Sequence, residues 1–151
     1  LALSLLSDLC RAGTPPAATF ALSPWCDLAL TGASLRINAD ADALLPVSRI
    51  DEVRDLALGP GCDPADPALS PLFAAFQGAS PVRLDWSATE ILRDDSRRMA
   101  ARLAAEGVAV TAVEAPGGPH AWPLFDGYLP EARATLRAVA AFAQSALDSS
   151  R

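Results

Sequence analysis

Apolar residues recur at helical spacing in four stretches of the chain, and each stretch is bounded by residues that start or stop helices. In the second stretch Ile50, Val53 and Leu56 share one side, which predicts a face turned toward the core. The predicted helices are residues 1–12, a segment that Ser48 caps and Gly59 ends, a segment that Asp94 or Asp95 opens and Gly107 ends, and a last segment from Pro130 to Leu147.

Between the helices lie short apolar runs of strand length. Residues 17–22 are a continuous apolar run, which is typical of a strand covered on both faces of a parallel sheet, and residues 108–113, apolar and β-branched, are the strongest candidate strand. Residues 81–86 form a third candidate strand, which Arg83 and Asp85 weaken. Alternating strands and helices predict the α/β class, with about three parallel strands and flanking helices in one domain.

Composition narrows the choice of function. The 151 residues are 51% hydrophobic and 20% charged, with a net charge of −6 and no lysine, which argues against nucleic acid or anionic lipid as a partner. The apolar runs are too short for a membrane helix. Three scattered cysteines and one histidine do not form a zinc motif and suggest a reducing, cytoplasmic compartment. We therefore expect no metal and no cofactor.

Candidate chemistry gathers after the last two predicted strands. Glu90 follows one strand and His120, in a loop rich in glycine and proline, follows the next, 30 residues later. Parallel strands of a βαβ unit end at the same edge of a sheet, so the two side chains can meet there. A carboxylate that accepts the imidazole Nδ1–H sets the tautomer and leaves Nε2 able to take a proton.

Simpler interpretations compete with this pair. A lone histidine in a loop is often a surface or structural residue, and Glu90 alone would be an ordinary loop acid. Asp94 and Asp95 most simply stabilise the start of a helix, although either could replace Glu90 as the acid.

Five short motifs stand in order along nearly the whole chain. They are Ser23-Pro24-Trp25-Cys26-Asp27-Leu28, Asp66-Pro67 with Ser70-Pro71-Leu72, Glu90-Ile91-Leu92-Arg93-Asp94-Asp95-Ser96, Pro119-His120-Ala121-Trp122 with Phe125, and Leu129-Pro130-Glu131-Ala132. In this order and spacing they resemble the hormone-sensitive-lipase-like esterases of the α/β-hydrolase superfamily. The acid motif of that family often reads D-P-L-x-D-E, and here Glu90 stands in place of the first aspartate.

The resemblance implies a serine carboxylester hydrolase in which His120 is the base and Glu90 the orienting acid. The family's G-D-S-A-G-G nucleophile motif and H-G-G-G loop do not occur in these 151 residues, and no G-x-S-x-G is present. Residues 1–151 therefore resemble the C-terminal portion of a single α/β-hydrolase domain, beginning just after the nucleophile. We expect the N-terminal half of the fold to be missing and the chain alone to be inactive.

The resemblance also implies a small-molecule ester substrate with a short to medium acyl chain. Trp122 and Phe125 could line the acyl pocket or simply pack under the loop. The strand at 108–113 could form the sheet edge of a homodimer. Two alternatives stay open: a noncatalytic α/β-hydrolase-like binding module, and a relative of peptidases or dienelactone hydrolases, which fits the motifs less well.

Overall fold

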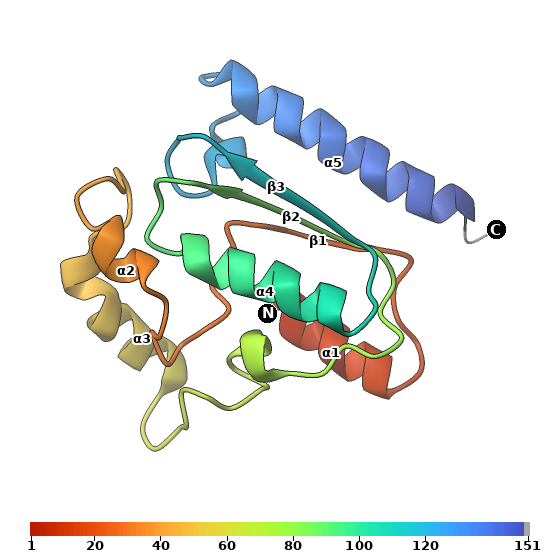
Figure 1. Ribbon diagram of the computed structural model, residues 1–151, viewed down its shortest axis with the longest axis horizontal. Helices are drawn as coiled ribbons and strands as arrows, with labels where there is room; N and C mark the ends of the chain where they lie inside the picture. Colours follow the sequence, from red (N-terminus) through yellow and green to blue (C-terminus); the bar gives the residue numbers. More distant parts are fainter. Residues whose placement is uncertain (150–151) are drawn as a thin grey trace.

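The computed structural model describes residues 1–149 and shows helices packed on a small sheet (Figure 1). The α-helices are α1 (Ala2–Arg11), α2 (Ser34–Ile37), α3 (Ile50–Leu58), α4 (Arg93–Ala105) and α5 (Pro130–Ser149). The strands are β1 (Thr19–Leu22), β2 (Val82–Ser87) and β3 (Val110–Ala115), and single 3₁₀ turns lie at Val47–Arg49, Pro71–Phe73 and Trp122–Phe125. The predicted α/β class is confirmed.

Within residues 1–149 the strands form one parallel sheet in the order β1-β2-β3. The registers place Leu22 opposite Asp85 and Ser87 opposite Ala115, so the carboxyl ends of the strands lie side by side. Helices α1 and α4 cover one face of the sheet and α5 runs along the other (Figure 1). This arrangement puts the loops that follow the three strands at one edge of the sheet.

The main core lies between the sheet and the pair α1 and α4. Leu6, Leu84, Met99 and Leu103 are almost completely buried there, together with Phe76 from the long connection between β1 and β2. The regular apolar spacing of α1 and α4 supplies one side of this core, as the sequence predicted. None of the helices in residues 1–149 combines the length and hydrophobicity needed to cross a lipid bilayer.

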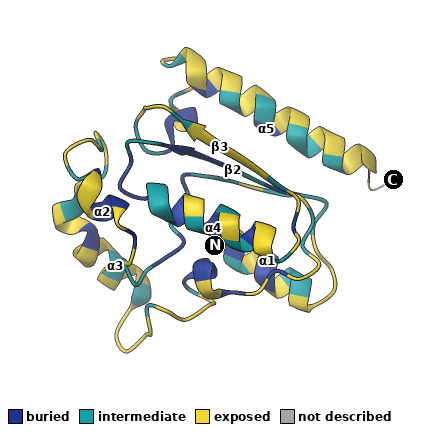
Figure 2. Ribbon diagram, in the orientation of Figure 1, coloured by how far each residue is buried: buried dark blue, intermediate teal, exposed yellow. Residues whose placement is uncertain are grey.

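The central strand β2 is buried along most of its length, whereas β3 is largely exposed (Figure 2). Arg83 and Asp85 do not disrupt β2, because two guanidinium nitrogens of Arg83 donate to the buried carboxylate of Asp85 at 2.7 Å each. The expectation that the strand at 17–22 is covered on both faces is wrong, because Phe20 in β1 is 46% exposed; Val113 in the other outer strand, β3, is 36% exposed. Apolar residues alone did not predict which strand is central.

The second predicted helix also differs from the expectation. Ser48 lies inside the 3₁₀ turn Val47–Arg49 and makes no cap to α3. Of the predicted inner face only Ile50 is buried, while Val53 and Leu56 face solvent. Ile50 packs in a second, smaller cluster with residues of α2 and of the loop after β2, so α3 adds to the edge of the sheet rather than to the main core.

Candidate active site

Glu90 lies in a tight turn between β2 and α4. Its side chain is fully buried, and each carboxylate oxygen has a polar partner. Oε1 accepts the backbone N–H of Ser87 at 2.9 Å, and Oε2 lies 2.9 Å from Nδ1 of His120. Because a buried carboxylate is costly without such partners, the turn and the histidine together make this position tenable.

His120 lies in the loop that follows β3, and this loop is hydrogen-bonded to the segments that follow β1 and β2. The N–H of Ala121 donates to the buried hydroxyl of Ser23, at the end of β1, over 3.0 Å. Both residues have left-handed backbone conformations, with φ of 51° and 48°. The hydroxyl of Thr89 donates to the carbonyl of Gly118 at 3.2 Å. Strained, non-glycine positions at such a junction are typical of loops whose shape is fixed by function.

The structure therefore brings Glu90 and His120 together, as the strand-end rule predicted. When Nδ1–H donates to the carboxylate, Nε2 is the ring nitrogen that can accept a proton. The side chain of His120 is 22% exposed, so the ring is held from one side and open on the other. This is the arrangement that a general base requires.

Asp94 and Asp95 both stand in the first turn of α4, as expected of helix-start residues. Asp94 accepts the N–H of Ser34, and Asp95 accepts the N–H groups of Cys26 and Asp27, each at 2.9 Å. Both carboxylates therefore accept hydrogen bonds from the backbone of the insert between β1 and β2. Glu90 is the carboxylate that meets the imidazole.

Burial raises the pKa of Asp95 from 3.8 to about 7, against the opposing effect of its two backbone N–H donors. Asp27 raises this pKa further and Arg98 lowers it. Between pH 4 and 7 the folded chain therefore holds a proton that the unfolded chain has lost. We predict that the free energy of unfolding falls by roughly 1–4 kcal/mol as pH rises across this interval, and is level above it. Urea denaturation at a series of pH values measures this slope.

The matched variant is Asp95→Asn, which keeps an oxygen for both backbone donors but cannot titrate. It should flatten the slope between pH 5 and 7. Arginine partners lower the pKa values of Glu114 and Asp126, so those groups act at lower pH and with the opposite sign. A wild-type stability that rises over this interval, or a slope that survives in Asp95→Asn, would contradict the prediction.

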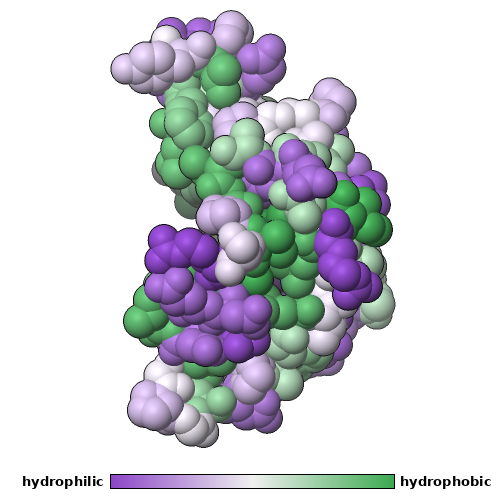
Figure 3. Space-filling model, turned by 90° about the vertical axis from the view of Figure 1, so that its left-hand side faces the viewer, coloured by the Kyte–Doolittle hydropathy of each residue, from purple (hydrophilic) through white to green (hydrophobic). Residues whose placement is uncertain are grey.

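An apolar cleft of about 370 Å³ opens beside His120. Figure 3, which views the side on which the strands end, shows hydrophobic residues gathered in a hollow of the surface. The cleft is lined by Ser23, Trp25, Leu45, Pro46, Arg49, Ile50, Val53, Leu92 and His120. A mostly apolar hollow with a polar group at one side is typical of small-molecule sites.

The structure decides between the two alternatives for Trp122, which were to line the acyl pocket or to pack under the loop. Trp122 is 4% exposed, and its indole N–H donates to the hydroxyl of Thr135 in α5 at 3.2 Å, so it packs under the loop. Neither Trp122 nor Phe125 lines the cleft. The aromatic residue that does so is Trp25, from the motif after β1. The sequence contained this residue but offered no spacing rule that placed it beside His120.

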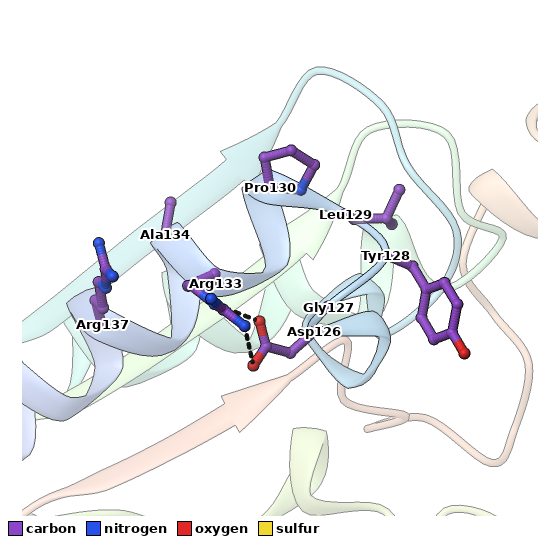
Figure 4. A pocket seen from close by; sticks show the side chains of 8 residues that line it. All are labelled: Asp126, Gly127, Tyr128, Leu129, Pro130, Arg133, Ala134 and Arg137. Atoms are coloured by element: carbon purple, nitrogen blue, oxygen red, sulfur yellow. Dashed lines mark hydrogen bonds and ion pairs between the residues drawn. The ribbon is translucent and has the colours of Figure 1, made fainter.

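A second concavity, of about 400 Å³, lies where the 3₁₀ turn Trp122–Phe125 meets α5 (Figure 4). Asp126 and Arg133 form an exposed ion pair in it, with Oδ1 and Nε 2.9 Å apart. Tyr128 at its rim is 87% exposed. This surface contains no buried polar group, and His120 is not among the residues that line it, so it is not the candidate active site.

Comparison with known proteins agrees with this geometry. Residues 1–124 match the model of a family with the α/β-hydrolase fold. The chain belongs to this α/β-hydrolase family. It is 34% identical over 147 residues to an acetyl-hydrolase of Streptomyces hygroscopicus, covering 97% of this chain and 49% of the relative. It is also 34% identical over 130 residues to an esterase of Acinetobacter venetianus, covering 86% and 43%.

Comparison of this α/β-hydrolase chain with solved structures identifies a narrower group of relatives. An esterase from the bacterial hormone-sensitive lipase family superimposes with a TM-score of 0.88 at 34% identity, over 93% of this chain and 47% of that one. A hormone-sensitive-lipase homologue from a metagenome library gives 0.90 at 27% identity, over 96% and 50%. The resemblance predicted from the five motifs is confirmed. The chain spans about half the length of the relatives it matches.

Proposed function

We propose that residues 1–151 act as the C-terminal half of a serine carboxylester hydrolase, in which His120 is the base and Glu90 orients it. The contact between Glu90 Oε2 and His120 Nδ1, buried at the end of adjacent parallel strands and open to an apolar cleft, carries the proposal. The names of the relatives, an acetyl-hydrolase and esterases, support the reaction class. They also support small-molecule esters as substrates.

The chemistry assigns each group one task. Nε2 of His120 takes the hydroxyl proton of a serine supplied by the preceding half of the domain, and that serine attacks the ester carbonyl. The imidazolium then protonates the leaving alcohol, and water releases the acid in a second round. Glu90 stabilises the imidazolium and keeps Nδ1 as the donor. Backbone N–H groups of the preceding half stabilise the oxyanion.

The dimensions and lining of the cleft favour short to medium acyl chains. Trp25, Leu45 and Leu92 offer apolar contact beside His120, in a space of about 370 Å³. We further propose a cytoplasmic location, which the three free thiols support. A homodimer through the exposed edge of β3 is also part of the proposal.

The gene tests the proposal first. The coding sequence upstream of Leu1 should continue in frame and place a G-D-S-A-G-G motif immediately before it. We call the product of that longer reading frame the extended chain. The extended chain should hydrolyse p-nitrophenyl acetate and butyrate faster than long-chain esters. The 151-residue chain should show no turnover above buffer, because the nucleophile and the oxyanion donors are supplied from outside it.

Two results would overturn the proposal. One is a start codon at this position with no upstream serine motif, which would favour a noncatalytic module. The other is enzyme-like turnover by the 151 residues alone, because the upstream serine would then not be required.

A further inference from the structure

Asn38 lies beneath the turn that carries Glu90. It follows α2 in the insert between β1 and β2, and it is 6% exposed. Its side-chain amide donates one proton to the carbonyl of Ala88 at 2.9 Å and the other to the carbonyl of Glu90 at 2.8 Å. Both N–H groups of this buried side-chain amide therefore bond to the turn that carries Glu90.

The carboxylate of Glu90 depends on the shape of this turn. Oε1 accepts the N–H of Ser87, three residues back in the same turn, and in this arrangement Oε2 lies 2.9 Å from Nδ1 of His120. If the carbonyls of Ala88 and Glu90 move, the distance between Ser87 and the carboxylate changes, and with it the direction of Oε2. The bonds from Asn38 are thus mechanically linked to the contact between acid and histidine.

We propose that Asn38 is a positioning residue for this pair: it holds the turn in the shape that aims Glu90 Oε2 at His120 Nδ1. The proposal rests on the proposed function and names a further residue for it.

Neighbouring residues of the insert act on different atoms. The hydroxyl of Ser34 donates to the carbonyl of Ile91 at 2.6 Å, and the carboxylate of Asp42 accepts the N–H of Ile91 at 2.8 Å. These bonds hold the backbone of Ile91, just before α4 begins. Asn38 bonds to Glu90 itself, and to Ala88 on the other side of the turn. The N–H of Arg93 also reaches the carbonyl of Glu90, at 3.2 Å, so the bond to Ala88 is the more distinctive contribution of Asn38.

The composition of the chain makes a direct test possible. It contains one histidine and one asparagine, so selective ¹⁵N labelling gives one imidazole ring and one asparagine side-chain amide in the NMR spectrum of the 151-residue chain. The wild-type ring should be held as the Nδ1–H tautomer, with an Nδ1 proton protected from exchange by Glu90. Glu90→Ala, which removes the carboxylate, defines the ring signals when this contact is lost.

Asn38→Ala and Asn38→Asp are the test variants. The first removes both donors, and the second keeps the volume but faces two carbonyls with an oxygen. Both should shift the ring ¹⁵N signals toward those of Glu90→Ala and abolish the protected Nδ1 proton. The control is Leu103→Ala, which opens a cavity in the main core and lowers stability but should leave the ring signals unchanged.

The proposal is overturned if either folded Asn38 variant retains the wild-type ring signals, or if Leu103→Ala shifts them equally. A second measurement uses only the wild-type chain, so it does not depend on whether any variant folds. The side-chain amide protons of Asn38 should exchange more slowly than those of the exposed Gln77, and equal rates would also overturn the proposal. Because no readout uses ester hydrolysis, failure of the proposed function would not be confused with failure of this inference.

Discussion

Replacing His120 by asparagine in the extended chain is expected to lower kcat for p-nitrophenyl acetate by about 10⁶-fold, the loss found when a serine protease is deprived of its base. The expected loss has one cause. Asparagine retains an amide N–H where the ring has Nδ1–H, so the buried carboxylate of Glu90 keeps a donor. Asparagine has no counterpart of Nε2, so nothing accepts the proton of the attacking serine.

Two measurements separate this loss from unfolding. The urea midpoint of His120→Asn should lie close to that of the wild type, because the loop is still tied to Ser23 through the N–H of Ala121. KM should change far less than kcat, because the apolar wall of the cleft is untouched. A variant that kept more than about one hundredth of the wild-type kcat would exclude His120 as the base, since general acid–base catalysis alone contributes at least about that factor.

The sequence predicted this pair because the relevant rule is topological. Adjacent parallel strands end at one edge, and the residues between Glu90 and His120 are enough for one helix, one strand and two loops. The prediction required only that each residue follow its strand, and did not depend on the exact position of the residue in the loop. Hydrophobic periodicity supplied the strands and α4, and the structure places the two side chains in contact.

The insert between β1 and β2 could not be predicted in the same way. α2 is four residues long, and it is held by polar bonds from Ser34 and Asn38 to residues more than fifty positions away. Such bonds leave no periodic trace in the sequence. The residues that line the cleft could not be predicted for the same reason, because Trp25 and Leu45 lie beside His120 only through the path that the insert follows.

Burial of β1 was mispredicted for a different reason, which β3 also illustrates. In β3 the residues Val110, Ala112 and Val113 are apolar, yet the helices in residues 1–149 leave much of this strand open. Strand β1 has β2 on one side and no second strand partner within the described residues. The apolar residues of a strand show that it can be buried. Whether it is buried depends on which helices and strands lie beside it.

Glu90→Gln in the extended chain is expected to lower kcat by about 10⁴-fold, as the equivalent change does in a serine protease. The geometry explains why an isosteric change is so costly. The wild-type carboxylate accepts from Ser87 N–H with one oxygen and from His120 Nδ1–H with the other. Glutamine has one oxygen, so its NH₂ group must face either the N–H of Ser87 or the ring.

If the oxygen stays on Ser87, the NH₂ group of Gln at position 90 requires Nδ1 to become the acceptor. The ring then carries its proton on Nε2 and cannot take the proton of the serine. Glu131→Gln, the same change in the exposed first turn of α5, serves as the control and should leave kcat unchanged. Glu90→Asp keeps two acceptors on a shorter side chain and should retain more activity than Glu90→Gln. If Glu90→Gln and Glu131→Gln gave equal kcat values, the buried contact with His120 would have no part in catalysis.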